Sequence, residues 1–333
     1  MQYPLPDIDQ QLYVDDHADK VIGLLGNAEF KTTLWRWQFH QRHQSPPIVM
    51  VDSQDKVKGF NGVMPVKVAI NGDVVNAVWS CDFVVAADTR GKGVGKQVKL
   101  ALQADYPRLM SLGISDSAVR VLSRMGWKQG DRVVTMRRLG SQRQWRDLVW
   151  LGCQKLLQYC FRQQVCAEGD LSWSDELPAK PQVDALSGRI VQDYPRMVVR
   201  DHDYLHWRYQ RHPFVSYRYL TLTDQSGLIA LLVVRDAAEH LRIVDYVGPG
   251  NERAIRCRLV KEVVSRYPAS RVFSCTTSDP DWIDVLWREA FLPTGQQRFY
   301  VYSETDGEPK GWFLMAGDSD GELLQAARGA TQR

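Results

Sequence analysis

The sequence predicts an α+β protein built from two units in tandem. Its 333 residues are enough for two domains of ordinary size. An apolar run over residues 81–86 leads through a glycine-rich turn into a helical pattern that starts at Val94. The second half then repeats three landmarks of the first, two of them at nearly equal offset. These three observations set the fold class, and each element follows from local pattern.

Hydrophobic periodicity divides residues 14–139 into helices and strands. Two helices come first, followed by a meander of three strands, in which Asn71-Gly72 is a strong hairpin signal. A helix, a strand, a helix and a closing strand complete the first half. The expected helices are residues 14–25, 33–40, 94–104 and 117–125, and the expected strands are residues 48–52, 57–70, 74–86, 108–114 and 133–137.

Residues 90–95, Arg-Gly-Lys-Gly-Val-Gly, have the composition of a phosphate-binding turn. Between a strand and a helix, such a turn presents backbone N–H groups at a helix N-terminus, where an anion is stabilised. Glycine lets the backbone approach closely because no Cβ intervenes, and Arg90, Lys92 and Lys96 add positive charge. The spacing excludes a dinucleotide fingerprint, which needs a glycine where Lys96 stands, and a nucleotide P-loop, which needs one where Arg90 stands.

The R-G-x-G-x-G pattern after a strand resembles the acyl-CoA signature of GCN5-related N-acetyltransferases (GNATs). The order of elements over residues 13–139 is similar to the fold of that family. A second family pattern, N-x-x-A-x-x-L-Y-x-x-x-G-F, has its counterpart at residues 115–127, but Ser115 replaces the asparagine and Leu122 replaces a tyrosine that often acts as general acid. The resemblance implies two tandem GNAT-like domains, each a mixed, mostly antiparallel central sheet flanked by helices.

Landmarks that recur in the second half indicate a duplication. The matching pairs are residues 34–43 with 205–212, Asp82 with Asp245, and residues 121–127 with 285–291. After Asp245 the second copy has Pro249, which lacks an N–H, and no basic residue over 246–251, so we expect only the first copy to bind acyl-CoA. The expected boundaries are 1–140 for the acyl-CoA-binding domain, 141–182 for an amphipathic helix and linker, 183–305 for a degenerate second domain, and 306–333 for a C-terminal segment and tail.

Residues 143–164, between the copies, place apolar side chains at helical spacing with basic residues interleaved. Two interpretations stand. One is an amphipathic helix that packs across the domain junction, and the other is an interfacial helix in peripheral contact with the inner face of a membrane. Residues 168–181 are polar with two prolines and are expected to form a linker. The tail after Gly317 is expected to fray.

The composition excludes several classes of protein. Hydrophobic residues at 44% and charged residues at 24% are typical of a globular chain, without an apolar run long enough to span a membrane. Residues 82–138 hold eleven Lys and Arg against five Asp and Glu, which suits an anionic cofactor such as coenzyme A, whereas no nucleic-acid motif accompanies this charge. The six cysteines form no C-x-x-C pair and the N-terminus has no signal-peptide pattern. We therefore expect reduced core thiols, no metal site and a cytoplasmic protein.

Acyl transfer to an amine needs one group that takes the proton of the amine and another that protonates the leaving thiolate. The resemblance implies that the strand before the glycine turn diverges from its neighbour, and that its backbone pairs with pantetheine and polarises the thioester carbonyl. Asp82 and Asp116 are the candidate bases, and Ser115 or Ser117 is the candidate acid, although this position also suits a helix N-cap. The expected cofactor-binding residues are Phe83, Val84, Val85, Arg90, Gly91, Lys92, Gly93, Val94, Gly95 and Lys96.

The resemblance favours an N-acetyltransferase that uses acetyl-CoA on an amine of a small or carbohydrate-like acceptor, by direct attack in a ternary complex, in bacterial polysaccharide or envelope biosynthesis. Two alternatives stay open. A peptidoglycan-bridge-type aminoacyl transferase has a similar duplicated fold, but that class generally lacks an intact R-G-x-G-x-G turn. A non-catalytic acyl-CoA-binding or scaffold protein is favoured by the missing tyrosine. The sequence leaves the acceptor, the acyl chain length and the oligomeric state open.

Overall fold

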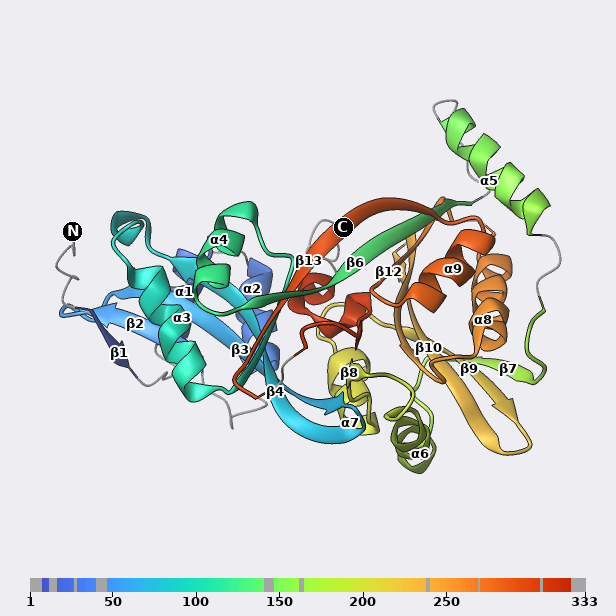
Figure 1. Cartoon of the computed structure of the whole chain (residues 1–333), viewed down its shortest axis with the longest axis horizontal. Coiled ribbons are helices and arrows are strands. Elements are labelled where there is room, and N and C mark those ends of the chain that lie inside the picture. The colour runs from blue at the N-terminus through green and yellow to red at the C-terminus, as the bar shows by residue number, and fades with distance from the viewer. Residues whose placement is uncertain are drawn as a thin grey trace.

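One mixed sheet runs through the whole molecule, and helices flank it in each half (Figure 1). The computed structural model describes residues 8–11, 17–26, 29–39, 47–140, 147–161, 165–237, 240–268, 270–305 and 308–324. The main path of the sheet has the strand order β1-β2-β3-β4-β5-β13-β6-β12-β11-β10-β9-β7; β8 joins it by pairing with β3, and β14 pairs in parallel with β8. Most neighbouring strands are antiparallel, and β4–β5 and β11–β12 are parallel.

The first half contains every element that periodicity predicts. Its helices are α1 (His17–Leu24), α2 (Glu29–Phe39), α3 (Val94–Asp105) and α4 (Asp116–Arg124), and its strands are β1 (Ile8–Gln11), β2 (Ile48–Asp52), β3 (Val57–Ile70), β4 (Asp73–Val85), β5 (Arg108–Leu112) and β6 (Lys128–Leu139). Strand β6 is longer than predicted because it has a hydrogen-bonded neighbour on both sides, β12 and β13.

The element order of the first half recurs in the second, and the predicted α+β fold class is confirmed. The helices are α6 (Lys180–Ile190), α7 (His202–Leu205) with a π-helical turn over His206–Gln210, α8 (Arg253–Arg266) and α9 (Pro280–Arg288). The strands are β8 (Arg196–Val198), β9 (Arg218–Asp224), β10 (Gly227–Ala237), β11 (His240–Val247), β12 (Val272–Thr277), β13 (Leu292–Ser303) and β14 (Trp312–Phe313).

The two halves exchange their last strands. Strand β13 of the second half pairs with β5 and β6, and β6 of the first half pairs with β12. Both strands cross the middle of the molecule (Figure 1). The main core is also shared, since Trp37 of α2 stacks on Trp207 with ring centroids 4.8 Å apart and planes 9° from parallel. The halves therefore form one folded body.

The segment predicted to be a linker, residues 168–181, contains a strand. Asp170–Ser174 forms β7, which pairs antiparallel with β9 along its whole length. Trp173 contacts the ring of Tyr267, directly after α8, at 5.6 Å between centroids and donates its Nε1–H to Glu262 on α8. Trp173 is the apolar side chain that anchors this otherwise polar segment, and its contacts hold β7 at the edge of the sheet.

The prediction of a frayed tail is wrong for residues 317–324. Asp318, Glu322 and Leu323 are fully buried or nearly so. Charge pairing explains this burial, because Asp318 accepts from Arg200 and Glu322 accepts from Arg235 inside the protein. Residues 325–333 lie outside the described residues.

Helix α5 (Leu148–Cys160) projects from the body at the end of β6 (Figure 1). Its Gln154 is buried and exchanges two hydrogen bonds with the backbone of Leu139. Its outward apolar side chains are exposed by 63 to 83%: Leu148, Val149, Leu156 and Tyr159. The flanking parts of the predicted helix, residues 143–146 and 162–164, lie outside the described residues. Within the described part of the chain, no helix is long and apolar enough to cross a bilayer.

All six cysteines are free thiols. Cys81, Cys257 and Cys275 are buried, as expected for core thiols, but Cys153 and Cys160 are exposed on α5. Helix α5 has only one face against the body, which explains this exposure. Among the described residues, no group of three or more His, Cys, Asp or Glu side chains has the arrangement of a metal site.

Candidate functional site

Strands β4 and β5 lie side by side only where β5 begins. They pair in parallel at Val78–Leu109 and Trp79–Met110, and no further pair follows in the described sheet. Strand β4 then continues to Val85, while β5 ends at Leu112. The backbone of β4 after Trp79 therefore has no strand partner on its β5 side. This divergence is the one that the family resemblance implies.

On its other side, β4 bulges against β3 at the same level. Phe60 faces Val84 and Gly62 faces Cys81, so Asp82 and the residue after it oppose a single residue of β3. Asp82 has a φ of 47°, in the left-handed region that aspartate tolerates better than most residues. The bulge turns the side chain of Asp82 out of the regular alternation of the strand.

A cavity of about 730 Å³ occupies the space between the diverging strands. Its wall is formed by β4, the glycine turn, the first turns of α3, the end of β5, the start of α4 and one residue of the C-terminal segment. Nine of the predicted site residues line it: Asp82, Phe83, Val85, Arg90, Gly91, Gly93, Gly95, Lys96 and Ser115. One pocket thus gathers the predicted phosphate turn and the predicted base.

Four predicted site residues do not belong to the described wall. Val94 is fully buried in the core under α3, and Val84 packs against the main core. Lys92 is exposed and does not line the cavity. Asp116 has a side chain 87% exposed and pairs with Arg298, so the structure keeps it away from the cavity.

The start of α3 has the properties of an anion site. Its N-cap residue is Gly93, with a φ of 89° and no side-chain cap, so the first N–H groups have neither an intrahelical acceptor nor a capping side chain. A Cβ at Gly95 would come within 3.2 Å of the Phe83 ring and 3.3 Å of Val85, so glycine keeps this approach open. The exposed cations Arg90 and Lys96 lie on the same wall. These features fit a pyrophosphate.

Asp82 is held by a lysine that the sequence analysis missed. Its Oδ1 accepts from Lys31 Nζ at 2.5 Å, and both side chains are less than a tenth exposed. Its Oδ2 is buried and has no hydrogen-bond partner in the described structure. Lys31 comes from α2, 51 residues earlier in the chain, and no local signal connects the two. One carboxylate oxygen thus stays available at the cavity.

Lys99 is a second missed residue of the cavity wall. It is only 5% exposed, and its Nζ lies 2.7 Å from both Asn61 Oδ1 and Ser80 Oγ. Nζ also lies 4.6 Å from the centroid of the Phe83 ring. Burial lowers the pKa of Lys99 to about 7. The available sequence signal was its place beside Val98 in the apolar stripe of α3.

Asp320 reaches the same cavity from the far end of the chain. Burial raises the pKa of its carboxyl to about 6, the negative charge of Asp82 adds to this, and Lys31 acts in the opposite direction. The polar sequence around this residue predicted a frayed tail instead. The cavity therefore contains two neighbouring carboxyl groups and a buried amine.

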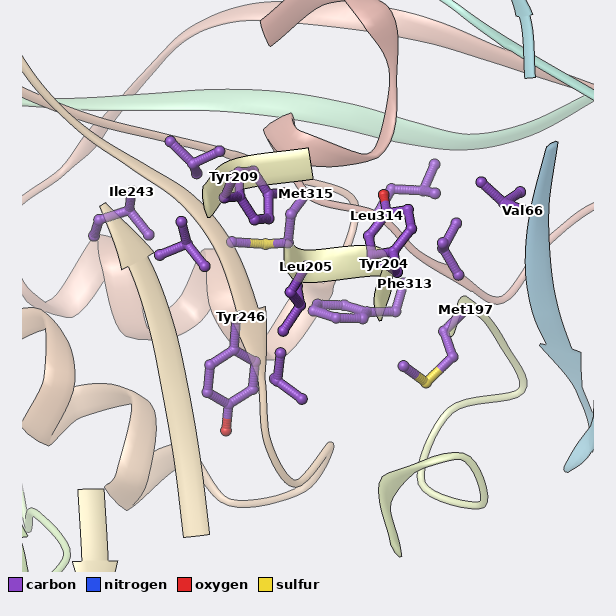
Figure 2. Close-up of a cluster of buried hydrophobic side chains, with 14 of the residues drawn as sticks. Val66, Met197, Tyr204, Leu205, Tyr209, Ile243, Tyr246, Phe313, Leu314 and Met315 are labelled. Carbon is purple, nitrogen blue, oxygen red and sulfur yellow. The ribbon is translucent and has the colours of Figure 1, made fainter. Parts of the chain in front are cut away.

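The corresponding gap in the second half is filled by the chain itself. Strands β11 and β12 pair only as far as Ile243–Cys275, and Met315 then bridges Thr277 at the end of β12. A Cβ at Gly317 would lie 1.8 Å from Tyr209 Oη, so this segment fits tightly. Figure 2 shows Met315 and Tyr209 packed together in this cluster.

Asp245, the counterpart of Asp82, is fully buried in the filled half. It accepts from Arg200 Nε at 2.8 Å through Oδ1 and from Tyr209 Oη at 2.7 Å through Oδ2. Both of its oxygens have protein partners. The two aligned aspartates thus have different environments: Asp82 lines a cavity, whereas Asp245 is buried in the core with both oxygens hydrogen-bonded.

No protein-family model matches the sequence, and a search of curated proteins finds no match. Solved structures do match. A GCN5-related N-acetyltransferase from Anabaena variabilis has a TM-score of 0.62 at 13% identity, over 88% of this chain and 72% of that chain. A probable N-acyltransferase from Enterococcus faecalis has a TM-score of 0.63 at 11% identity, over 88% and 71%. Saccharomyces cerevisiae N-myristoyltransferase, solved with myristoyl-CoA, has a TM-score of 0.57 at 12% identity, over 93% and 87%.

At identities of 11 to 13%, these structural likenesses show the fold alone, so the chemistry has to be argued from the site. The glycine turn is the part of this site that the sequence pattern indicated, and the divergent strands are the part that the family resemblance implied; the bulge at Asp82 was not predicted. The chain has the fold of the GCN5-related N-acetyltransferase superfamily.

Proposed function

We propose that this chain is an acyl-CoA-dependent N-acyltransferase that moves an acetyl group from acetyl-CoA to an amine of a small or carbohydrate-like acceptor. One observation carries the proposal: a single cavity of about 730 Å³ joins an uncapped, glycine-rich helix N-terminus to a buried carboxylate and a buried amine. The fold, which N-acetyltransferases share, supports acyl transfer in general. An intact glycine turn disfavours the aminoacyl-transferase alternative.

The residues present fit coenzyme A. The free N–H groups of Gly93 and Gly95 and the cations Arg90 and Lys96 would hold the pyrophosphate. The unpaired backbone of β4 would pair with the pantetheine arm, and a backbone N–H at Phe83 would polarise the carbonyl. When bound, the cofactor supplies an acyl group activated as a thioester.

The carboxyl pair is the proposed proton acceptor. An amine attacks only as the free base, so its proton must pass to a nearby group. Asp82 Oδ2 has no hydrogen-bond partner among the described residues, and Asp320 has a pKa of about 6, close to the working range of a base. Two carboxylates in one site share a proton more readily than either would bind one alone. Lys31 fixes the orientation of Asp82 through Oδ1.

Lys99 is the proposed proton donor. Leu122 stands where the family pattern has a tyrosine, and Lys99 lies on the same cavity wall as Leu122. A pKa of about 7 makes its ammonium a stronger acid than an ordinary thiol, whose pKa is roughly 8.5. Proton transfer from Lys99 Nζ to a leaving thiolate is therefore downhill. Asn61 and Ser80 hold the amine in place.

Reversing the charge of the turn tests the cofactor site. We expect Arg90→Glu to raise the Kd for acetyl-CoA at least tenfold, about 1.4 kcal/mol, because this side chain lies on the cavity wall. Lys92→Glu makes the same change of charge at an exposed position of the turn that does not line the cavity, and it should alter the Kd less than about threefold. Calorimetry on both folded variants gives the comparison. Equal affinities in all three proteins would refute the assignment of the turn.

A screen of amines then distinguishes a catalytic acyltransferase from a non-catalytic acyl-CoA-binding or scaffold protein. Wild-type protein that binds acetyl-CoA is expected to release free thiol with at least one amine of a panel of amino sugars and small polyamines. Binding without turnover on any amine would instead support the non-catalytic acyl-CoA-binding alternative.

We also propose peripheral membrane contact through α5, and the exposure of its apolar side chains supports it. Leu156→Glu should lower co-sedimentation with phosphatidylglycerol vesicles at least tenfold, because it places a charge on the apolar face. Gln158→Glu adds the same charge at an exposed polar position of the helix and serves as the control. Wild-type protein that stays in the supernatant at low salt would contradict this proposal.

A further inference from the structure

A second cavity, of about 680 Å³, lies in the other half of the molecule. Its described wall shares no residue with the first cavity and is formed mainly by the π-helical turn after α7, the loop that follows it and strand β9. Its volume is in the range of small-molecule sites. No step of the proposed acyl transfer uses it.

Three buried polar groups on this wall have no hydrogen-bond partner in the described structure. They are His212 Nε2, Tyr217 Oη and Tyr219 Oη. His212, Tyr217 and Tyr219 are 8%, 2% and 1% exposed, respectively. Folded proteins seldom leave buried polar groups unpaired, because the lost hydration is not replaced. Three of them on one cavity wall indicate a ligand that supplies the missing partners.

The protonation states of these three groups determine which hydrogen-bond donors and acceptors a ligand must supply. His212 Nδ1 accepts the backbone N–H of Phe214 and of Val215, each at 3.3 Å, so the ring proton is on Nε2. Burial, and then the charges of Arg208 and Arg235, lower the pKa of His212 to about 3, so the ring stays neutral. Burial also raises the pKa values of Tyr217 and Tyr219, so both keep their protons.

The wall therefore presents one N–H donor and two hydroxyls that donate or accept. Its charged side chains disfavour an anion, because Arg218 is already paired with Asp175 at 2.9 Å and Asp236 adds a further negative charge. Tyrosine rings supply apolar faces beside the polar groups.

We propose that this cavity binds a neutral, hydroxyl-rich ligand of the size of a mono- or disaccharide, whose hydroxyl groups pair with His212, Tyr217 and Tyr219. A sugar matches the wall because each hydroxyl both donates and accepts, and each ring offers an apolar face. The site lies in the half whose strand gap is filled, so that half keeps a binding role of its own.

Saturation-transfer NMR with glucose, mannose, N-acetylglucosamine and maltose at up to 20 mM tests the proposal. At least one of these probes is expected to bind, and Tyr217→Phe and Tyr219→Phe should each weaken its binding about fivefold or more. Tyr204→Phe is the matched control, because its hydroxyl is also buried and unpartnered but lies off the cavity wall. Glucose 6-phosphate should bind no more tightly than glucose.

Thermal unfolding without ligand gives an independent result. Since the hydroxyls of Tyr217 and Tyr219 have no partner in the described structure, removing either should leave Tm unchanged or raise it. A Tm lowered by several degrees would mean that the protein itself satisfies these hydroxyls and would overturn the proposal. Failure of all four probes to bind folded wild-type protein, or equal weakening by Tyr204→Phe, would overturn it as well.

Discussion

Lys99→Met is expected to lower kcat by about two to three orders of magnitude, the usual contribution of a positioned general acid. Methionine keeps the length and the apolar stem of the side chain but carries no proton. The affinity for acetyl-CoA should change little, because Lys99 lies beneath the Phe83 ring rather than among the cations of the turn. The measurement is steady-state thiol release with the acceptor found in the amine screen.

The pH profile separates catalysis by Lys99 from a structural role. Activity requires the Asp320 carboxyl ionised, above its pKa of about 6, and Lys99 protonated, below its pKa of about 7. Wild-type kcat/KM should therefore rise and then fall through a narrow maximum between these values. In Lys99→Met the fall on the alkaline side should disappear. An unchanged alkaline limb in the variant would refute the proton-donor role.

Stability gives a second signature of the same residue. The pKa of Lys99 is 10.5 in the unfolded chain and about 7 in the folded one, so the unfolded chain binds more protons between these values. The free energy of unfolding must then rise with pH in this window, by on the order of 2 to 3 kcal/mol from pH 7 to pH 9. Lys99→Met should lack this rise in urea titrations at the two pH values. Parallel curves for both proteins would contradict the lowered pKa.

Asp245→Ala is expected to destabilise the protein by about 3 to 5 kcal/mol, because it leaves the guanidinium of Arg200 partly uncompensated in the core. The side chains of Arg200 and Asp245 are 0% exposed, and Tyr209 loses its acceptor as well. Urea denaturation at pH 7 measures the change. The affinity for acetyl-CoA should stay intact in the fraction that remains folded.

Asp203→Ala is the matched control in the same half. Asp203 pairs with Lys180, but these side chains are 74% and 51% exposed, so its loss should cost less than about 1 kcal/mol. Similar losses for the two variants would mean that the buried pair contributes no more than a surface pair. Asp82→Asn completes the comparison: asparagine tolerates the same φ, but it leaves the buried ammonium of Lys31 without this ion-pair partner, so we expect it to lower both turnover and stability.

Local sequence patterns predicted most of the helices and strands, and the part of the site that the glycine turn forms. The glycine turn, its flanking strand and helix, and the role of Ser115 as an N-cap all depend on residues close in sequence. Asp116 shows the limit of such reasoning, because its position at a helix start suited a base, but Arg298, 182 residues away, pairs with it at the surface.

The missed residues share a physical cause. Lys31, Lys99 and Asp320 become significant only through contacts with distant parts of the chain, and periodicity carries no information on these. At the C-terminus the polar composition predicted an exposed, frayed segment. Glu322 nevertheless lies in the core, because Arg235 and Arg242 form ion pairs with it there. The exchange of the last strands between the halves could not be predicted either, because the hydrophobic pattern of β6 is the same whichever strand it pairs with.

Strand exchange also imposes an order on synthesis. The edge of β5 obtains its partner only when Phe299 pairs with Leu112, roughly 190 residues later in the chain. At about 5 to 20 residues per second, a ribosome needs about 10 to 40 s to supply that partner. During this interval the emerging first half exposes an open sheet edge beside its unfinished cavity, which is where chaperones and misdirected strands compete. The completed candidate cavity therefore forms only when almost the entire chain has left the ribosome.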